Sequence, residues 1–498
     1  MYPRIKTIIA EAHLDSGGAY DNSSGGGSSP ASPGTTESDG SSSADELCPP
    51  DLTEFRRHAS QLRLSSARGE EFDRDCIRQA SAVSAPDELD VDDIHSHHQR
   101  MLLLLPAFAS TADADADAAA RAEALSHWLS GFDVAWVLDM DASALRHREL
   151  GRRVAAWAQA LSTMERVFRL RHRELARAQA AALGELAAAS AGAMLTLASA
   201  VAALGSSPST LLAALDMYAP LSETYPALAT LFSWPPSHPV PAAADAALAG
   251  VVGAARRGGR DLPAFVRSHH YPWQTPQGGE VHPCVGFWMG YLRCILRSRV
   301  SLHLILADEG GGGESPAPGA DGGHVLVTEL VSCLEAVLEE NAAALAFPGL
   351  RHVFMLNNTH AVTRRAAGSD DLRRFLPPEW HRAREERMEG YVRGYMDASW
   401  ARVVSRLGGG CGGGRAAKQG GRRRSTLGAF YAAFENAWSA QRSWKVPDPK
   451  LRGVLREAVS EYVVPAYRRY LEDHPEVEAA IGRTAEELEQ QLSALFEG

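Results

Sequence analysis

The chain has 498 residues, of which 45% are hydrophobic and 22% charged, and a formal net charge of −11. This composition fits a globular protein, and the length excludes a single small module and corresponds to about two to four folding units. Because the sequence is rich in Ala and poor in Ile and Thr, we predict an all-α protein.

The cysteines and the N-terminus indicate the cellular compartment of the protein. The six cysteines are scattered without a C-x-x-C pair, so we predict neither a disulfide framework nor a zinc site, and a reducing compartment fits best. They are Cys48, Cys76, Cys284, Cys294, Cys333 and Cys411. The N-terminus lacks the order of a signal peptide, since Glu11 follows a short apolar run at once. We therefore expect no secretion.

The first third of the chain divides into two predicted regions. Residues 1–50 form a disordered leader, because positions 15–50 are rich in Gly, Ser and Pro and have almost no apolar content. Residues 51–150 form a short, divergent helical region. Within it, the Asp-Ala run at 113–120 is either a helix start or a loop.

From residue 151 onward the pattern is helical. Val154, Trp157, Leu161 and Met164 fall on one apolar helix face, followed by Val167 and Phe168. The segment Leu186–Leu215 has no charged residue and is long enough to cross a bilayer. Since it consists mostly of Ala, Ser and Gly, we predict a buried helix followed by a turn at 205–208.

Later helices are separated by Pro- and Gly-rich breaks, and some of their ends can be predicted. The breaks lie at 233–239, 270–273, 309–318 and 408–421. Asp448 is placed to cap a helix with Pro449 in its first turn and with Leu451, Val454, Leu455, Ala458 and Tyr462 on its apolar face. We expect Pro465 to kink or end that helix. A last helix starts at Thr484, with Glu487 in capping-box position.

The sequence lacks several motifs that are typical of catalysis and metal binding. The glycine runs at 309–313 and 408–421 lack the G-x-x-x-x-G-K-[ST] pattern of a phosphate loop. His269, His270, His282 and Cys284 are close in sequence but have no helical H-E-x-x-H spacing, so we interpret the three histidines as loop residues rather than metal ligands. There is also no G-x-S-x-G elbow. We predict a binding protein, and no enzyme, cofactor or metal.

The charge is unevenly distributed. Residues 361–470 contain 22 Lys and Arg against 11 Asp and Glu, a local charge of +11. Such a block indicates an anionic partner, either a membrane surface or nucleic acid, unless the arginines only solvate helix faces. Four aromatic residues in this block have helical spacing and are predicted to be core residues rather than a base-stacking platform. They are Phe430, Phe434, Trp438 and Trp444.

A basic stretch at 422–426 (RRRST) is predicted to close a flexible loop. It would suit a basophilic kinase, with Ser425 as the phosphosite, because a phosphate there would cancel local positive charge. A solvated basic loop explains the same residues equally well, and the sequence leaves both interpretations open.

Several strings in a fixed order resemble one protein family. They lie at 350–358 (LRHVFMLNN), 399–400, 434–435, 444–449 (WKVPDP), 464–468 (VPAYR) and 495–498 (LFEG), preceded by matches at 157–161, 215–232 and 281–291. Together they closely resemble the plant form of the exocyst subunit named for its seventy-kilodalton member (Exo-seventy), over about residues 150–498. Six or more strings in order are specific, although no single one is.

The resemblance implies a fold and a function. The fold would be an elongated rod of consecutive antiparallel helical bundles over 151–498, with a basic C-terminal part at 350–498. The protein would be cytoplasmic and peripheral at the plasma membrane, where an octameric complex tethers secretory vesicles. Its implied partners are other exocyst subunits and anionic phosphoinositide lipid, which would attract the basic block and leave no role for nucleic acid. A small GTPase is a further candidate partner.

Two departures from the family limit this transfer. The family's long N-terminal coiled coil has no clear counterpart. The family's K-Y-I-K-Y string before the last helix aligns its lysines with Ala479 and Gly482, so that only Ile481 and a displaced Arg483 remain. We therefore assign lipid contact to Lys450, Arg452, Arg456, Arg468 and Arg469, with Arg483. These departures also motivate an alternative, a diverged interaction or decoy protein in plant immunity outside the exocyst.

Overall fold

The structure is a computed structural model that describes only part of the chain. The described residues are 91–109, 114–139, 150–171, 173, 175–232, 238–268, 275–307, 322–408, 419–475 and 483–497. The predicted leader (1–50) lies outside them, as do Cys48, Cys76, Cys411, His269, His270, Ala479 and Gly482.

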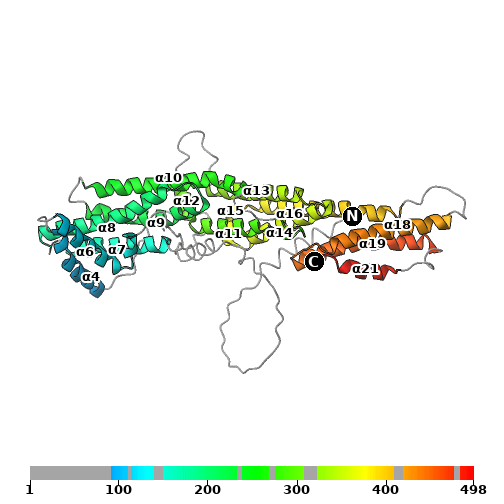
Figure 1. The fold of residues 1–498 in the computed structure, drawn as a ribbon, viewed down its shortest axis with the longest axis horizontal. Coiled ribbons are helices and arrows are strands. Elements are labelled where there is room, and N and C mark those ends of the chain that lie inside the picture. Colours follow the sequence, from blue (N-terminus) through cyan, green and yellow to red (C-terminus); the bar gives the residue numbers. More distant parts are fainter. Residues whose placement is uncertain are drawn as a thin grey trace, which may run out of the picture. The chain divides into compact units, whose positions relative to one another are not determined.

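Helices make up nearly all of the described residues, which confirms the predicted all-α class (Figure 1). They are α4 (Val91–Leu104), α5 (Pro106–Ala109), α6 (Ala114–Ser130), η3 (Ala135–Val137), α7 (Leu150–Arg171), α8 (Arg177–Ala203), α9 (Pro208–Leu231), α10 (Pro239–Arg267), α11 (Pro283–Arg297), α12 (Arg299–Ala307), α13 (Gly322–Ala343), α14 (Pro348–Ala367), α15 (Asp370–Phe375), α16 (Pro378–Ser399), α17 (Ala401–Ser405), α18 (Gln419–Gln441), α19 (Pro449–Glu472) and α21 (Ala485–Ser493). The only β-pairing in the described residues is an isolated bridge between Lys445 and Glu497.

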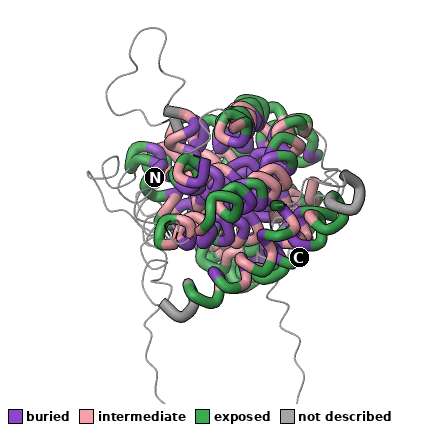
Figure 2. The backbone as a smooth tube through the Cα atoms, turned by 90° about the vertical axis from the view of Figure 1, so that its left-hand side faces the viewer, coloured by how far each residue is buried: buried purple, intermediate pink, exposed green. Residues whose placement is uncertain are grey.

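The chain divides into two compact units. We call Cys48–Ser268 with Gly290–Leu330 the N-terminal unit, and His269–Met289 with Val331–Gly498 the C-terminal unit. Around the individual helices, buried and exposed positions lie on different sides, as amphipathic sequences require (Figure 2).

The N-terminal unit is a bundle around α7, α8, α9 and α10. Helix α10 packs against both α8 and α9, and α7 packs against α9. The predicted apolar face of α7 is confirmed, since Val154, Trp157, Leu161 and Met164 are fully buried. The indole Nε1 of Trp157 donates a hydrogen bond to the Ser190 carbonyl of α8 at 3.1 Å, so its one polar atom is satisfied inside the core.

Helix α8 corresponds to the uncharged segment. It ends at Ala203, and α9 begins at Pro208 with Ser207 as its N-cap, so the predicted helix and turn are both confirmed. Among the described residues α8 is the one helix that is long and apolar enough to cross a membrane, and 50% of its most apolar window is buried inside the unit. That burial agrees with a core helix.

One carboxyl group is buried among the described residues of the N-terminal unit. Asp216 on α9 is almost inaccessible to solvent, with 4% of its surface exposed. Burial raises its pKa to about 7, because the charged form would lose its hydration.

The C-terminal unit contains a buried ion pair between helices. Arg384 of α16 donates two hydrogen bonds to Glu335 of α13, from Nε to Oε1 at 2.9 Å and from Nη2 to Oε2 at 2.8 Å. Its guanidinium also lies over the Trp380 ring, 4.3 Å from the centroid. A bidentate ion pair of this kind fixes the orientation of both helices as well as their separation.

Two adjacent amides of α14 hold three segments of the C-terminal unit together. Asn357 Nδ2 donates to the carbonyls of Gly279 at 2.7 Å and Lys445 at 2.9 Å. Asn358 Oδ1 accepts from the backbone N–H of His282 at 2.7 Å. Gly279 has φ +85°, a conformation that other residues rarely adopt, so the loop before α11 depends on this glycine as well as on the amides.

The predicted helix ends around α19 and α21 are confirmed. Asp448 caps α19 by accepting from the N–H groups of Lys450 and Leu451, both at 3.0 Å. Thr484 and Glu487 form the capping box of α21. The apolar face of α19 is as predicted for Leu451, Val454, Leu455 and Ala458, while Tyr462 is only half-buried and the buried side continues through Val459, Val463 and Tyr467.

Helix boundaries differ from expectation at Pro465 and at 422–426. An end of α19 at Pro465 is wrong, because the helix continues to Glu472, whereas a kink there stays a prediction. Proline has no N–H for the Glu461 carbonyl one turn earlier, but both residues are exposed, so water can reach that carbonyl. The stretch 422–426 does not close a loop, because α18 is helical from Gln419. Arginine is a good helix former, and buried Phe430 and Phe434 fix the helix downstream.

We predict that Asn358→Ala destabilises the C-terminal unit by about 2 to 3 kcal/mol, because the buried N–H of His282 loses its acceptor. Urea unfolding measures this cost. The matched control is Thr363→Ala on the same helix, whose buried hydroxyl bonds only to the Thr359 carbonyl and should cost about 1 kcal/mol. Equal losses in the two variants would contradict a special role for the amide.

Candidate functional site

The predicted lipid-contacting cations do not form one patch. Five of them lie on α19, where Arg456 and Arg468 are separated by about 18 Å along the helix axis, given a rise of about 1.5 Å per residue. The set therefore splits into a group near the start of α19 (Lys450, Arg452 and Arg456) and a group near its end. The second group includes Arg483, because Tyr467 of α19 donates a hydrogen bond to the Arg483 carbonyl at 2.9 Å.

The first group is largely engaged inside the protein. Arg452 Nε donates to the Val446 carbonyl at 3.0 Å. Arg456 donates from Nε at 2.8 Å and from Nη2 at 2.6 Å to the Leu495 carbonyl, and it pairs with Glu497 at 3.2 Å. These bonds attach the segment after α21 to α19. Lys450 is exposed in the first turn of α19.

The second group faces the acidic helix α21. Arg468 Nη2 lies 3.3 Å from Glu486 and 3.7 Å from Glu489, both on α21, and half of the Arg468 side chain is exposed (49%). Neighbouring Arg469 is also exposed, and the described part of the chain offers it no ion-pair partner. Arg469 is thus the cation of this group best placed to meet an external anion.

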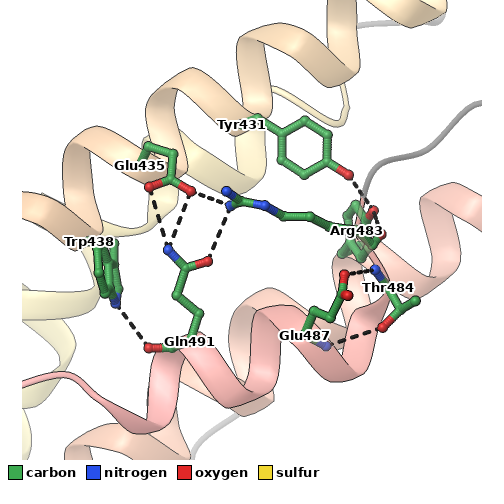
Figure 3. Close-up of polar contacts among 8 residues, drawn as sticks. Tyr431, Glu435, Trp438, Arg483, Thr484, Glu487 and Gln491 are labelled. Carbon is green, nitrogen blue, oxygen red and sulfur yellow. Dashed lines mark hydrogen bonds and ion pairs between the residues drawn. The ribbon is translucent and has the colours of Figure 1, made fainter.

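Arg483 lies at the centre of a polar network between α18 and α21 (Figure 3). Its Nη1 donates to Glu435 of α18 and, at 3.2 Å, to Gln491 of α21. Gln491 Nε2 donates back to Glu435 at 3.3 Å, and the guanidinium lies over the Tyr431 ring, 5.9 Å from its centroid. The hydrogen bond from Arg483 is the main cause of the lowered pKa of the Glu435 carboxyl.

Two further contacts join α18 to its neighbours α21 and α19. The indole Nε1 of Trp438 donates to the Gln491 carbonyl at 2.9 Å, and the hydroxyls of Tyr431 and Tyr467 are 2.7 Å apart. Three of the four aromatic residues of the basic block are core residues, as predicted, whereas Trp438 joins α18 to α21. Phe430, Phe434 and Trp444 are buried, and Trp438 is half-buried.

The sequence reasoning missed the acidic partners of these cations, namely Glu435, Glu486, Glu489 and Glu497. A signal existed for three of them. Residues 484–498 contain four glutamates and no Lys or Arg, next to a helix rich in arginine. Ion pairs between these segments could have been anticipated, although not which residues would pair.

Other candidate residues have simpler environments. Cys284, Cys294 and Cys333 are buried, and none of the three forms a disulfide among the described residues. His282 accepts a hydrogen bond from the N–H of Cys284 at 3.2 Å, and within the described residues no group of three His, Cys, Asp or Glu could hold a metal ion. Ser425 lies in α18, and its side chain is outside the described set.

We predict that Arg483→Gln lowers the free energy of unfolding by about 1 kcal/mol, a value that allows for the partial exposure of the pair with Glu435. Thermal unfolding measures the loss. Arg469→Gln is the matched control, because the same charge is removed without breaking a described contact, and its effect should stay within about 0.5 kcal/mol. A loss as large in the control would contradict the structural role of Arg483.

Two exocyst components of Arabidopsis thaliana are similar to this chain. The chain is 25% identical over 331 residues to the exocyst complex component EXO70A1 of Arabidopsis thaliana, covering 63% of this chain and 51% of that protein. It is 26% identical over 325 residues to EXO70C2 of the same plant, covering 61% of this chain and 45% of that protein. The chain thus spans about half the length of these curated relatives.

A solved structure and a family model give further matches. The Saccharomyces cerevisiae Exo70 structure aligns with a TM-score of 0.48 and 12% identity, over 99% of this chain and 97% of that one. The family model that describes the C-terminal region of the Exo70 exocyst complex subunits matches residues 156–494. Because that match covers well over half of the sequence and includes both α19 and α21, the chain belongs to the Exo70 family of exocyst subunits.

Proposed function

We propose that this protein acts as an exocyst subunit that tethers secretory vesicles to the plasma membrane, through contacts with other exocyst subunits and with anionic phosphoinositide lipid. The observation that carries the proposal is the family match over 156–494. The names of the Arabidopsis relatives, each an exocyst complex component, point the same way. The protein would be cytoplasmic and peripheral at the membrane.

The lipid half of the proposal is supported by charge. The block 361–470 has a local charge of +11, and each basic residue near an anionic membrane contributes about 1 kcal/mol to binding. Within the predicted set, Lys450 and Arg469 lie at exposed positions, whereas Arg456 and Arg483 are only partly exposed. We therefore give Lys450 and Arg469 the principal lipid-contacting roles.

A second candidate function is a diverged interaction or decoy protein in plant immunity that works outside the exocyst. The observation that favours it is the weakened basic C-terminus. Ala479 and Gly482 stand where the family's lysines align, and Arg483 is paired with Glu435. Under this alternative the helical fold is kept as a scaffold for other partners, and membrane binding is weak or lost.

Affinity purification from plant tissue separates the two functions. We predict that the tagged full chain recovers the other exocyst subunits, identified by mass spectrometry, because family members are subunits of that complex. An unrelated tagged protein of similar size controls for background. Consistent absence of the other subunits with an intact bait would reject the tethering role and favour the diverged function.

Vesicle co-sedimentation tests the lipid half. We predict that the full chain binds vesicles in proportion to their phosphoinositide content, that high salt weakens binding, and that Lys450→Glu with Arg469→Glu lowers affinity about tenfold or more. Arg260→Glu with Arg267→Glu is the matched control, since it makes the same change in net charge at exposed positions of α10. Equal losses in both variants, or binding that survives high salt, would contradict the assignment.

A further inference from the structure

Helix α21 and the residues after it form an acidic cover beside a basic helix. Residues 484–498 contain Glu486, Glu487, Glu489 and Glu497 and no Lys or Arg. Helix α19, against which α21 packs, has five basic residues and three acidic ones. The opposite charges of the two helices meet within one unit at Arg468, next to Arg469, to which the proposed function gives a lipid-contacting role.

The cations of α19 differ in how firmly α21 and the residues after it hold them. Arg456 donates two of its N–H groups to a backbone carbonyl and is only 25% exposed, so it is structural. Among the described residues, the side chain of Arg468 has two carboxylate partners, Glu486 and Glu489, which are 74% and 55% exposed. Exposed ion pairs of this kind are weak and sensitive to salt. A membrane phosphate could therefore replace these partners of Arg468.

Helix α21 itself stays in place during such an exchange. Leu488, Leu492, Leu495 and Phe496 are almost fully buried beneath the acidic surface. Burial of four large apolar side chains outweighs two exposed ion pairs many times over, so competition for Arg468 does not release the helix. The glutamates thus act from fixed positions on a docked helix.

We propose that Glu486 and Glu489 restrain the membrane binding of this protein by occupying Arg468 and lowering the positive potential at the end of α19. The inference rests on the proposed function, because it presumes an anionic lipid surface as the partner. The restraint sets a threshold in the negative charge density of the membrane. Lipid has to compete with two internal carboxylates, so that only a membrane of high negative charge density engages Arg468 fully.

The test uses the full chain and vesicles of phosphatidylcholine containing about 5 mol% phosphatidylinositol 4,5-bisphosphate. We predict that Glu486→Gln with Glu489→Gln raises the partition coefficient about fivefold, the factor expected when one more basic residue contacts the surface. Glu386→Gln with Glu457→Gln is the matched control. Both of these residues are exposed, neither has a described pairing with Arg468, and the change in net charge is the same.

A second substitution identifies the cation involved. Arg468→Gln should have little effect in the wild-type chain, because Arg468 is already paired, but it should abolish the gain when added to the Glu486→Gln, Glu489→Gln variant. Thermal unfolding checks that α21 stays docked, since Glu486 also favours its N-terminal turn.

The outcomes separate the inference from the function on which it rests. Equal gains in the test and control variants, or a gain that survives Arg468→Gln, would overturn the restraint while leaving membrane binding intact. No binding by any variant would overturn both the restraint and the lipid half of the proposed function, and the purification result would stand independently. Membrane binding by the Glu486→Gln, Glu489→Gln variant alone would support the restraint most strongly.

Discussion

The side-chain amides of Asn357 and Asn358 fix the arrangement of three segments in the C-terminal unit. Their side-chain amides satisfy backbone groups of the loop at 279–282 and of Lys445, segments far from α14 in sequence. Buried backbone groups without partners would be costly, so the amides determine where these segments can lie. Asp448, which caps α19, follows three residues after Lys445. Lys445 also forms the isolated backbone β-bridge with Glu497. The position of the basic helix thus follows from two amides on another helix.

Much of the fold could be predicted from local sequence. The start of α19 is encoded by Asp448 and Pro449, and the start of α21 by Thr484 and Glu487, because a cap is a contact between residues two or three positions apart. Apolar spacing likewise predicted the buried face of α7. The resemblance to the family added the identity of the chain, which periodicity alone could not supply.

The errors and omissions concern information that is not local. Whether Pro465 ends a helix depends on whether the carbonyl of Glu461 faces water, and that is decided by tertiary packing. The acidic partners of Arg468 and Arg483 lie 18 to 48 residues away, beyond any helical pattern. A count of basic residues therefore overestimated how many cations are available to a membrane, since it could not tell a surface arginine from one that fastens α21.

The burial of Asp216 has a consequence for the N-terminal unit. In the unfolded chain this carboxyl ionises near pH 4, whereas in the folded unit its pKa is about 7. Between these values folding takes up a proton from the solvent, so the stability that the protonated carboxyl contributes is complete below pH 4 and is lost as the pH rises toward 7. Folding of the unit is therefore coupled to the uptake of a proton. The pH of the solvent thus affects the folding equilibrium through Asp216, a residue that is almost inaccessible to solvent.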